Sequence, residues 1–229
     1  MKTMFKNNIK WIVGFLCLIA FVALAENVFN REIMQIDIMG YQIMDRYFIS
    51  ETTIPIAKVI TQLGGAFFLV ALGIVLTIMI KNKKVGLAIW INLIIVTVIN
   101  FLLKYILQRP RPTGYRIVEE SGYSFPSGHS MISMAFYGFL IYLIYMNIEN
   151  KKFKYGLIGL LSITIIGIGM SRIFLGVHYT SDVLAGFLIS IAYVIVYANI
   201  VKKYLFKGKE QNNEFETETK NKSKNEEIS

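Results

Sequence analysis

Three short polar segments interrupt an otherwise apolar chain, and they hold the residues best suited to binding and attacking an anion. Their named positions supply three cations, one carboxylate and both histidines of the chain. Membrane-embedded chains retain ionisable side chains mainly for function, so this cluster predicts a site that handles an anionic group. The segments are Lys104-x6-Arg111-Pro112, Pro126-Ser127-Gly128-His129 and Ser171-Arg172-x5-His178-x3-Asp182.

The three cations suit a phosphate group. Phosphoryl transfer asks a protein mainly to position the reactants and to stabilise charge on the phosphate oxygens. Lys104 supplies a compact point charge, whereas Arg111 and Arg172 each offer a planar fork for two oxygens. These three residues are therefore predicted to bind phosphate.

Prolines set the course of the chain around Arg111. Pro110 and Pro112 prevent a helix from continuing through this arginine, which is expected on a rigid turn that reaches back over the site. Arg109 and Arg116 are interpreted differently, as basic residues that anchor a span end at the membrane interface.

The segment Pro126-Ser127-Gly128-His129 opens an apolar run, as a helix N-terminus does. Ser127 is expected to cap the helix while the free amides of Gly128 and His129 point outward. Helix N-termini attract phosphate, glycine lets the backbone approach a ligand, and His129 in the first turn can reach the same anion. The string alone also fits a simple capped helix start.

His178 and Asp182 stand four residues apart, which brings them together on a helix. Asp182 can then accept a hydrogen bond from Nδ1 of His178 and leave Nε2 free to attack phosphorus, forming a phosphohistidine. His129 is expected to protonate the leaving oxygen. Asp182 favours the imidazolium and the nearby cations oppose it, so the sequence leaves the protonation balance open.

Two other interpretations of these residues remain. One is a structural His–Asp hydrogen bond at a helix start, and the other is a metal site made from His129, His178 and Asp182. Three neighbouring cations would repel a divalent ion, so no metal and no other cofactor is expected.

The three segments resemble the tripartite motif of the type 2 phosphatidic acid phosphatase superfamily, whose members are integral-membrane lipid phosphatases. Every motif position from Lys104 to Asp182 is filled. The resemblance implies a bundle of six membrane helices, with His178 as the nucleophile and a lipid phosphate as the substrate. Similar bacterial proteins act on undecaprenyl diphosphate, phosphatidylglycerol phosphate or phosphatidate, and the motifs do not distinguish these lipids.

Other activities stay open beside hydrolysis. A phosphotransferase would pass the phosphoryl group to another lipid or sugar, and a transporter would carry an anionic lipid without breaking bonds. An oxidative activity is also conceivable, because the family shares its active-site plan with vanadium haloperoxidases. Those relatives are soluble proteins, and nothing in this apolar chain favours their chemistry.

Composition indicates a membrane protein. The chain has 229 residues, of which 55% are hydrophobic and 17% are charged, and its mean hydropathy is +0.52. A helix needs roughly 20 apolar residues to cross a bilayer. The sequence predicts an all-α, polytopic protein with six transmembrane helices near 11–28, 60–80, 85–106, 127–146, 155–172 and 182–201, all in one domain over residues 1–206.

The lysines are sorted along the chain. Most of them precede the first span, separate the second from the third and the fourth from the fifth, or follow the sixth, whereas Lys58, Lys104 and every arginine lie toward the opposite side. The positive-inside rule places these ends, and both termini, in the cytoplasm, so the three segments face outward from the cell membrane. Although the net charge is +9, this sorting argues for a bilayer and against nucleic acid as the partner.

The remaining segments have less defined roles. The start of the chain also resembles a signal peptide ending at Ala25, but a retained span is expected. Cys17 lies inside this span, and a single cysteine offers neither a disulfide nor a cysteine metal site. Residues 26–59 fit an amphipathic helix lying on the surface, either a lid over the site or a plain connection. Residues 207–229 are expected to form a disordered cytoplasmic tail.

Overall fold

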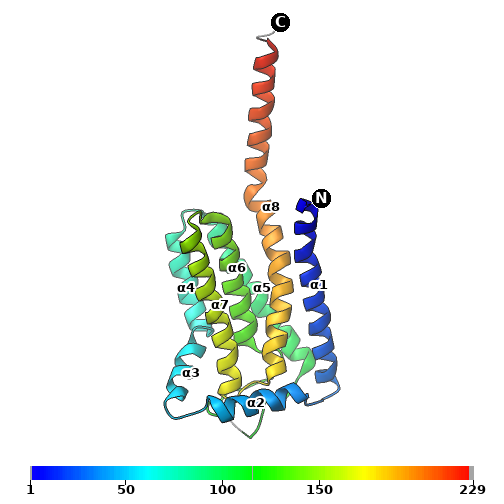
Figure 1. Ribbon diagram of the computed structural model, residues 1–229, viewed down its shortest axis with the longest axis vertical. Helices are drawn as coiled ribbons and strands as arrows, with labels where there is room; N and C mark the ends of the chain where they lie inside the picture. Colours follow the sequence, from blue (N-terminus) through cyan, green and yellow to red (C-terminus); the bar gives the residue numbers. More distant parts are fainter. Residues whose placement is uncertain (1, 115, 227–229) are drawn as a thin grey trace.

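The regular structure of the chain is entirely α-helical over the described part. The computed structural model describes residues 2–114 and 116–226, with side chains over 8–114 and 116–204. The helices form an upright bundle with one helix lying across its end (Figure 1). They are α1 (Lys2–Phe29), α2 (Gln35–Tyr47), α3 (Thr53–Gln62), α4 (Ala66–Met79), α5 (Lys83–Leu107), α6 (Gly128–Asn147), α7 (Lys151–Phe174) and α8 (Thr180–Glu226).

The spans agree with the all-α, polytopic prediction. Within the described residues, α1, α5, α6, α7 and α8 are each long and apolar enough to cross a membrane. The pair α3 and α4 raises the number to six when counted as one broken span. The second predicted span, 60–80, is therefore wrong as a single straight helix, because α3 and α4 meet at an angle of 50°.

Two successive glycines explain the break between α3 and α4. A Cβ on Gly64 would lie 2.6 Å from Cγ2 of Ile168 and 3.4 Å from Cδ2 of His129, so only glycine allows this close approach. The hydroxyl of Tyr137 donates to the carbonyl of Leu63 at 2.7 Å and satisfies a polar group that the break frees. The bend thus brings the end of α3 against α6 and α7.

Helix α6 is the centre of the bundle. It packs against α5, α7 and α8, and α1 packs on α8. Buried polar side chains join these helices: Nδ2 of Asn92 donates to the carbonyl of Ala135 at 3.0 Å, and Oγ of Ser190 donates to the carbonyl of Met131 at 2.7 Å. Such bonds hold helices together in a membrane, where lipid tails are as apolar as the helix surfaces and the hydrophobic effect does not drive helices to associate.

Helix α2 lies across the end of the bundle, against α7 and α8 (Figure 1). It is the surface-lying helix expected within residues 26–59, although α1 takes the start of that segment and α3 its end. A Cβ on Gly40 would lie 1.9 Å from Oγ1 of Thr180, so a glycine is required for α2 to rest on the start of α8. This contact places α2 directly over the segment that carries the second histidine.

The first helix packs into the bundle, whereas the last helix extends beyond it. Helix α1 is packed into the bundle, with Nζ of Lys10 donating to Oδ1 of Asn199 at 3.1 Å. Helix α8 leaves the bundle and projects beyond it to Glu226, where the sequence predicted a boundary at 207 and a disordered tail (Figure 1). The composition is compatible with a helix, because this stretch is rich in the helix formers lysine and glutamate.

Candidate active site

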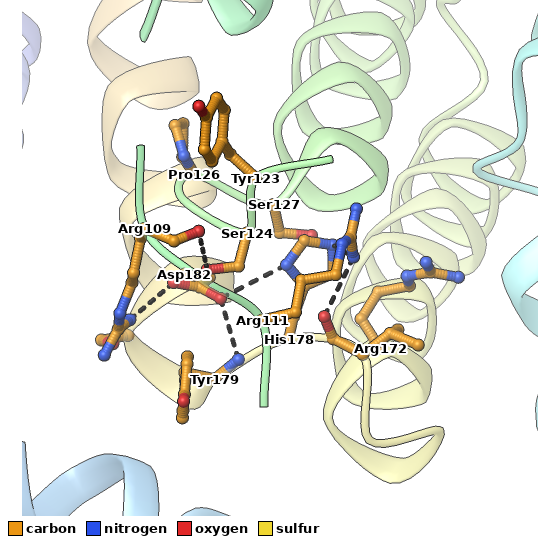
Figure 2. A network of polar contacts seen from close by, with 12 residues as sticks. Arg109, Arg111, Tyr123, Ser124, Pro126, Ser127, Arg172, His178, Tyr179 and Asp182 are labelled. Carbon is orange, nitrogen blue, oxygen red and sulfur yellow. Dashed lines mark hydrogen bonds and ion pairs between the residues drawn. The ribbon is translucent and has the colours of Figure 1, made fainter. Parts of the chain in front are cut away.

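The three polar segments meet at the end of the bundle that α2 covers. Helices α5 and α7 end there and α6 and α8 begin there, while the two loops after α5 and α7 close over the same space (Figures 1 and 2). The turns joining α4 to α5 and α6 to α7, which carry the lysines, lie at the opposite end. The residues predicted from sequence are thus gathered in one place.

The histidine–aspartate pair is in contact as predicted, although His178 lies in the bend before α8 and only Asp182 is on the helix. Nδ1 of His178 lies 3.3 Å from Oδ2 of Asp182, which also accepts a hydrogen bond of 2.9 Å from the backbone amide of Tyr179 (Figure 2). Nε2 of His178 lies 3.2 Å from Nη1 of Arg111. A guanidinium can only donate, so Nε2 is the acceptor and the ring proton sits on Nδ1. The ring therefore presents a lone pair toward the cations.

The surroundings of His178 keep its ring neutral. Burial lowers its pKa to about 4, with Arg111 and Arg172 acting in the same direction and Asp182 opposing them. At pH 7 the imidazole is therefore uncharged, as a nucleophile must be. The structure resolves the balance that the sequence left open: desolvation and cations outweigh the carboxylate.

Arg111 lies between Pro110 and Pro112 in the irregular loop after α5, where the described residues 108–114 form no turn, and is held by backbone oxygens. Its guanidinium donates to the carbonyls of Ser121, Gly122 and Val177, each at 3.0 Å. Burial is the main reason that the pKa of Arg111 lies below its ordinary value, but a guanidinium stays charged at any physiological pH. The side chain is thus a fixed cation beside Nε2 of His178.

Arg172 is almost fully buried at the end of α7 and has two side-chain partners. Nη1 donates to Oγ1 of Thr61 at 2.7 Å, and Nη2 donates to Oε1 of Glu120 at 2.5 Å. Nε has no hydrogen-bond partner among the described residues. The bend after α3 is what brings Thr61 to this arginine.

Glu120 belongs to the site, although sequence reasoning did not select it. Its carboxylate bonds to Arg172, and its second oxygen lies 3.9 Å from Nη2 of Arg111. Burial alone would raise the pKa of Glu120, but its bond to Arg172 and the charges of both arginines hold that pKa below the usual range. An ionised carboxylate thus contacts the two guanidinium groups predicted to bind phosphate.

The cap of α6 is formed as predicted. Oγ of Ser127 accepts from the amide of Ser130 at 3.4 Å, and the amide of Ser127 donates to the carbonyl of Asp182 at 3.0 Å. A Cβ on Gly128 would lie 3.1 Å from Oδ1 of Asn100, so α5 approaches this helix start closely. The cap ties the second polar segment to the third.

Lys104 lies at the end of α5, where it faces the loop that leads into α6. Its Nζ donates to the carbonyl of Tyr123 and, at 3.4 Å, to that of Ser124. A Cβ on Gly128 would lie 3.9 Å from Cε of Lys104, so the aliphatic part of the lysine side chain passes beside the start of α6. Lys104 therefore belongs to the same cluster as the arginines.

His129 stands between the cation cluster and an apolar cavity. The cavity has a volume of about 480 Å³ and lies among α4, α5 and α6. His129 and Gly128 form one edge, and the remaining walls are almost entirely apolar, including Leu69, Trp90 and Ile132. A polar site thus opens directly onto a hydrophobic space.

Arg109 is not the interfacial anchor that the sequence suggested. It is only 5% exposed and pairs with two buried carboxylates, through Nη1 to Oδ1 of Asp182 at 2.6 Å and through Nη2 to Oδ2 of Asp37 at 2.7 Å. These charges outweigh burial and raise the pKa of Arg109 above its ordinary value. Arg116, by contrast, is exposed and contacts only the carbonyl of Pro112 among the described residues.

The donors do not suit a metal site. Among the described residues, no three side chains of histidine, cysteine, aspartate or glutamate are grouped as a metal ion requires. Both oxygens of Asp182 are already engaged, one by Arg109 and one by His178 and Tyr179. The metal site considered from His129, His178 and Asp182 is therefore not formed.

The comparison with known families agrees with this arrangement. The profile of the PAP2 superfamily matches residues 83–205, more than half of the chain. The chain belongs to this superfamily. The match covers all three polar segments, whereas α1 to α4 lie outside it.

Several characterised proteins are similar in sequence over part of their length. Phosphatidylglycerophosphatase B from Bacillus subtilis is 34% identical over 56% of this chain and 65% of its own length. Dolichyldiphosphatase 1 from Dictyostelium discoideum and undecaprenyl-diphosphatase from Sulfolobus acidocaldarius are each 25% identical, over 60% and 57% of this chain. The matches span 61% and 62% of those two proteins, so less than two thirds of each relative is covered.

A solved structure has the same fold. The transmembrane PAP2-type phosphatidylglycerolphosphate phosphatase from Bacillus subtilis superimposes with a TM-score of 0.73 and 24% sequence identity. The superposition covers 83% of this chain and 96% of that chain. The bundle is therefore a multi-pass membrane fold of the same type.

Proposed function

We propose that the protein removes the terminal phosphate of a membrane lipid phosphate or diphosphate through a covalent phosphohistidine on His178. One observation carries this proposal: the His178 ring is held through Nδ1 by Asp182 while Nε2 faces Arg111 at 3.2 Å. The ring is neutral and buried among fixed cations. This arrangement suits a nucleophile that attacks a phosphate, whereas a structural His–Asp pair would not need the cations.

The reaction follows from the placement of these groups. Nε2 of His178 attacks phosphorus in line, the bond between phosphorus and the lipid oxygen breaks, and the leaving oxygen takes a proton from His129. Water then attacks the phosphohistidine and gives a proton to His129, which releases inorganic phosphate and restores both the lone pair on Nε2 of His178 and the acid form of His129. Arg111, Arg172 and Lys104 stabilise the charge on the phosphate oxygens in both steps, which removes the need for a metal.

The apolar cavity supports a lipid as the substrate. It begins at His129, the residue assigned to the leaving oxygen, and continues between α4, α5 and α6. A hydrocarbon chain attached to that oxygen would extend into the cavity and bury its apolar surface. The relatives named above act on phosphatidylglycerophosphate and on polyprenyl diphosphates, so these two lipid classes and phosphatidate are the substrates we propose.

The sorted lysines support an outward-facing site. Except for Lys58 and Lys104, the lysines between the spans lie in or beside turns at the end of the bundle opposite to the polar cluster (Figure 1), and ends rich in lysine stay in the cytoplasm. We therefore propose a multi-pass protein of the cell membrane with an extracytoplasmic active site and cytoplasmic termini.

Release of inorganic phosphate by purified protein tests the proposal. Phosphatidate, phosphatidylglycerol phosphate and a polyprenyl diphosphate are compared, each with the wild type and with His178→Asn. Loss of the nucleophile is expected to lower turnover by at least about 10³-fold with every substrate. A labelled phosphoryl group that appears on an added acceptor and not as free phosphate would indicate a phosphotransferase. Undiminished turnover by folded His178→Asn protein would refute the proposal.

A further inference from the structure

Asp182 has a second partner besides the histidine. Its Oδ2 contacts His178, while its Oδ1 accepts a hydrogen bond of 2.6 Å from Nη1 of Arg109 (Figure 2). The same nitrogen donates to Oγ of Ser181 at 2.8 Å, and the guanidinium stacks on the ring of Tyr179 with 4.0 Å between Cζ and the ring centroid. Arg109 is therefore fixed on every side against the start of α8.

Asp37 continues this chain of contacts from α2. Its Oδ2 accepts from Nη2 of Arg109 at 2.7 Å, and its Oδ1 accepts from the backbone amide of Ser181 at 2.8 Å. Asp37 is 3% exposed and Asp182 is completely buried. Two buried carboxylates thus share one guanidinium, and one of them also binds the N-terminus of α8, where a negative charge is favoured.

We propose that Arg109 and Asp37 are positioning residues for the reaction assigned to His178: Arg109 fixes the orientation and the charge of Asp182, and Asp37 fixes Arg109. This inference rests on the proposed function for its catalytic meaning. The carboxylate behind a histidine can orient the ring only if that carboxylate is itself held. Asp182 has one oxygen for the ring and one for Arg109, so rotation about its carboxyl group is blocked.

The charges matter as much as the geometry. His178 is faced by Asp182 on α8, by Arg111 on the loop after α5, by Arg172 on α7 and by His129 on α6, with Glu120 bound to the two arginines and Lys104 beyond them. Arg109 offsets the charge of Asp182, and Asp37 offsets part of the charge of Arg109. Removing Arg109 would leave Asp182 uncompensated and favour the imidazolium, which cannot attack phosphorus.

The test measures steady-state kinetics and the titration of His178 in Arg109→Gln, Asp37→Asn and their double variant. The chain has only two histidines, so NMR of protein with labelled histidine resolves both, and a His129→Gln variant assigns them. Arg109→Gln is expected to lower kcat by about 10- to 100-fold, as loss of outer partners does at ligating histidines, and to change KM by less than about 3-fold. Asp37→Asn is expected to lower kcat by about 3- to 10-fold.

The direction of the titration shift separates positioning from general loosening. Arg109→Gln is expected to raise the pKa of His178, because it exposes the charge of Asp182. Asp37→Asn removes a negative charge and is expected to leave that pKa unchanged or lower it. A loosened site would admit water and raise the pKa in both variants, which would overturn the proposal. Wild-type kcat and titration in Arg109→Gln would overturn it as well.

Two further variants guard the interpretation. Arg109→Lys keeps the charge without the fork, so it is expected to restore the wild-type titration and only part of kcat; an unrestored titration contradicts the assigned role. Arg116→Gln, an exposed arginine on the same loop, is the matched control and is expected to behave as wild type. The NMR titration needs no turnover, so it reports on Arg109 even if the test with His178→Asn refutes the proposed function.

Discussion

Glu120 holds the guanidinium that the proposed function assigns to phosphate, so an incoming phosphate has to displace it. The variant Glu120→Gln keeps the size of the side chain and removes its charge. We predict that this variant binds phosphate-like anions more tightly than the wild type does. The carboxylate is a competitor in this account, and its removal should help the ligand.

The size of the effect follows from the contacts of Glu120. A charge-assisted hydrogen bond contributes about 1.5–3 kcal/mol, and the 2.5 Å bond to Arg172 is of this kind. Glu120 is 31% exposed, and its contact to Arg111 is 3.9 Å long, so screening by water reduces the value to about 1–2 kcal/mol. Since 1.4 kcal/mol corresponds to about tenfold in affinity, the inhibition constant of an anion should fall by about 5- to 30-fold.

Inhibition by inorganic phosphate or orthovanadate measures this effect at fixed pH and ionic strength. The arginines hold the pKa of Glu120 below its usual range, so the wild-type carboxylate is ionised and competes at neutral pH. As the pH falls through that lowered pKa, the carboxylate becomes protonated and the competition weakens. The difference between wild type and Glu120→Gln should therefore be full at pH 7 and shrink toward acid pH.

The neighbouring glutamate provides the control. Glu119 is exposed, and Glu119→Gln removes one negative charge from the same loop without touching either arginine. This variant should leave the inhibition constant within about 2-fold of the wild type, because exposed charges are screened. An equal or weaker affinity of Glu120→Gln for both anions, or the same gain in Glu119→Gln, would refute the reasoning.

Two other predictions concern the leaving group and the bend after α3. His129→Ala should slow phosphatidate-type monoesters more than diphosphates in a phosphate-release assay, because the diphosphate leaving group is already a weak base; equal losses would remove the role of His129 as an acid. Gly64→Ala places a Cβ 2.6 Å from Cγ2 of Ile168, and overpacking of about 1–3 kcal/mol should lower the melting temperature by about 2–12 °C. Gly159→Ala, where a Cβ meets nothing within 4 Å, should leave the melting temperature unchanged or higher, and equal shifts would contradict the packing argument.

The membrane helices were predictable because their signal is local. The apolar runs that predicted spans at 85–106, 127–146 and 155–172 match α5, α6 and α7 to within four residues at each end. The break between α3 and α4 had a local signal too, since Gly64 and Gly65 interrupt the second run. A hydropathy average does not register these glycines, because glycine is not strongly polar. The close contact of Gly64 with α6 and α7 nevertheless requires a residue without a side chain.

The meeting of the three polar segments was predictable from the family resemblance, whereas detailed geometry was predictable only between residues that lie near one another in the chain. The pair His178–Asp182 and the cap at Ser127 depend on spacings of three or four residues, and both make the expected contact. Thr61 and Arg172 are 111 residues apart, and Arg109 and Asp37 are 72 apart. No spacing rule connects such pairs, because the packing of α2 and α3 alone brings them together.

Asp37 did carry a local signal. It stands between Ile36 and Ile38 in the segment assigned to a surface helix, and a carboxylate among apolar residues needs a partner. The partner could not be named from sequence, and Arg109 was assigned to the membrane interface because basic residues at span ends commonly lie there. Burial decides the matter, since a guanidinium that is 5% exposed cannot serve as an interfacial anchor.

The site contains two buried carboxylates that are held by Arg109 and one partly exposed carboxylate, Glu120, that is held less strongly. Asp182 and Asp37 are completely or almost completely buried, and removing a partner from such a pair costs about 3–5 kcal/mol. Glu120 is partly exposed and its interaction is worth about 1–2 kcal/mol by the argument above. If the cluster binds phosphate as proposed, the anion is therefore expected to displace Glu120 from the two arginines and to leave Arg109 on Asp182. Asp182 would keep its bond to Arg109 while Arg111 and Arg172 exchange Glu120 for phosphate. The charge of Asp182 would therefore stay offset, and the ring of His178 would stay neutral.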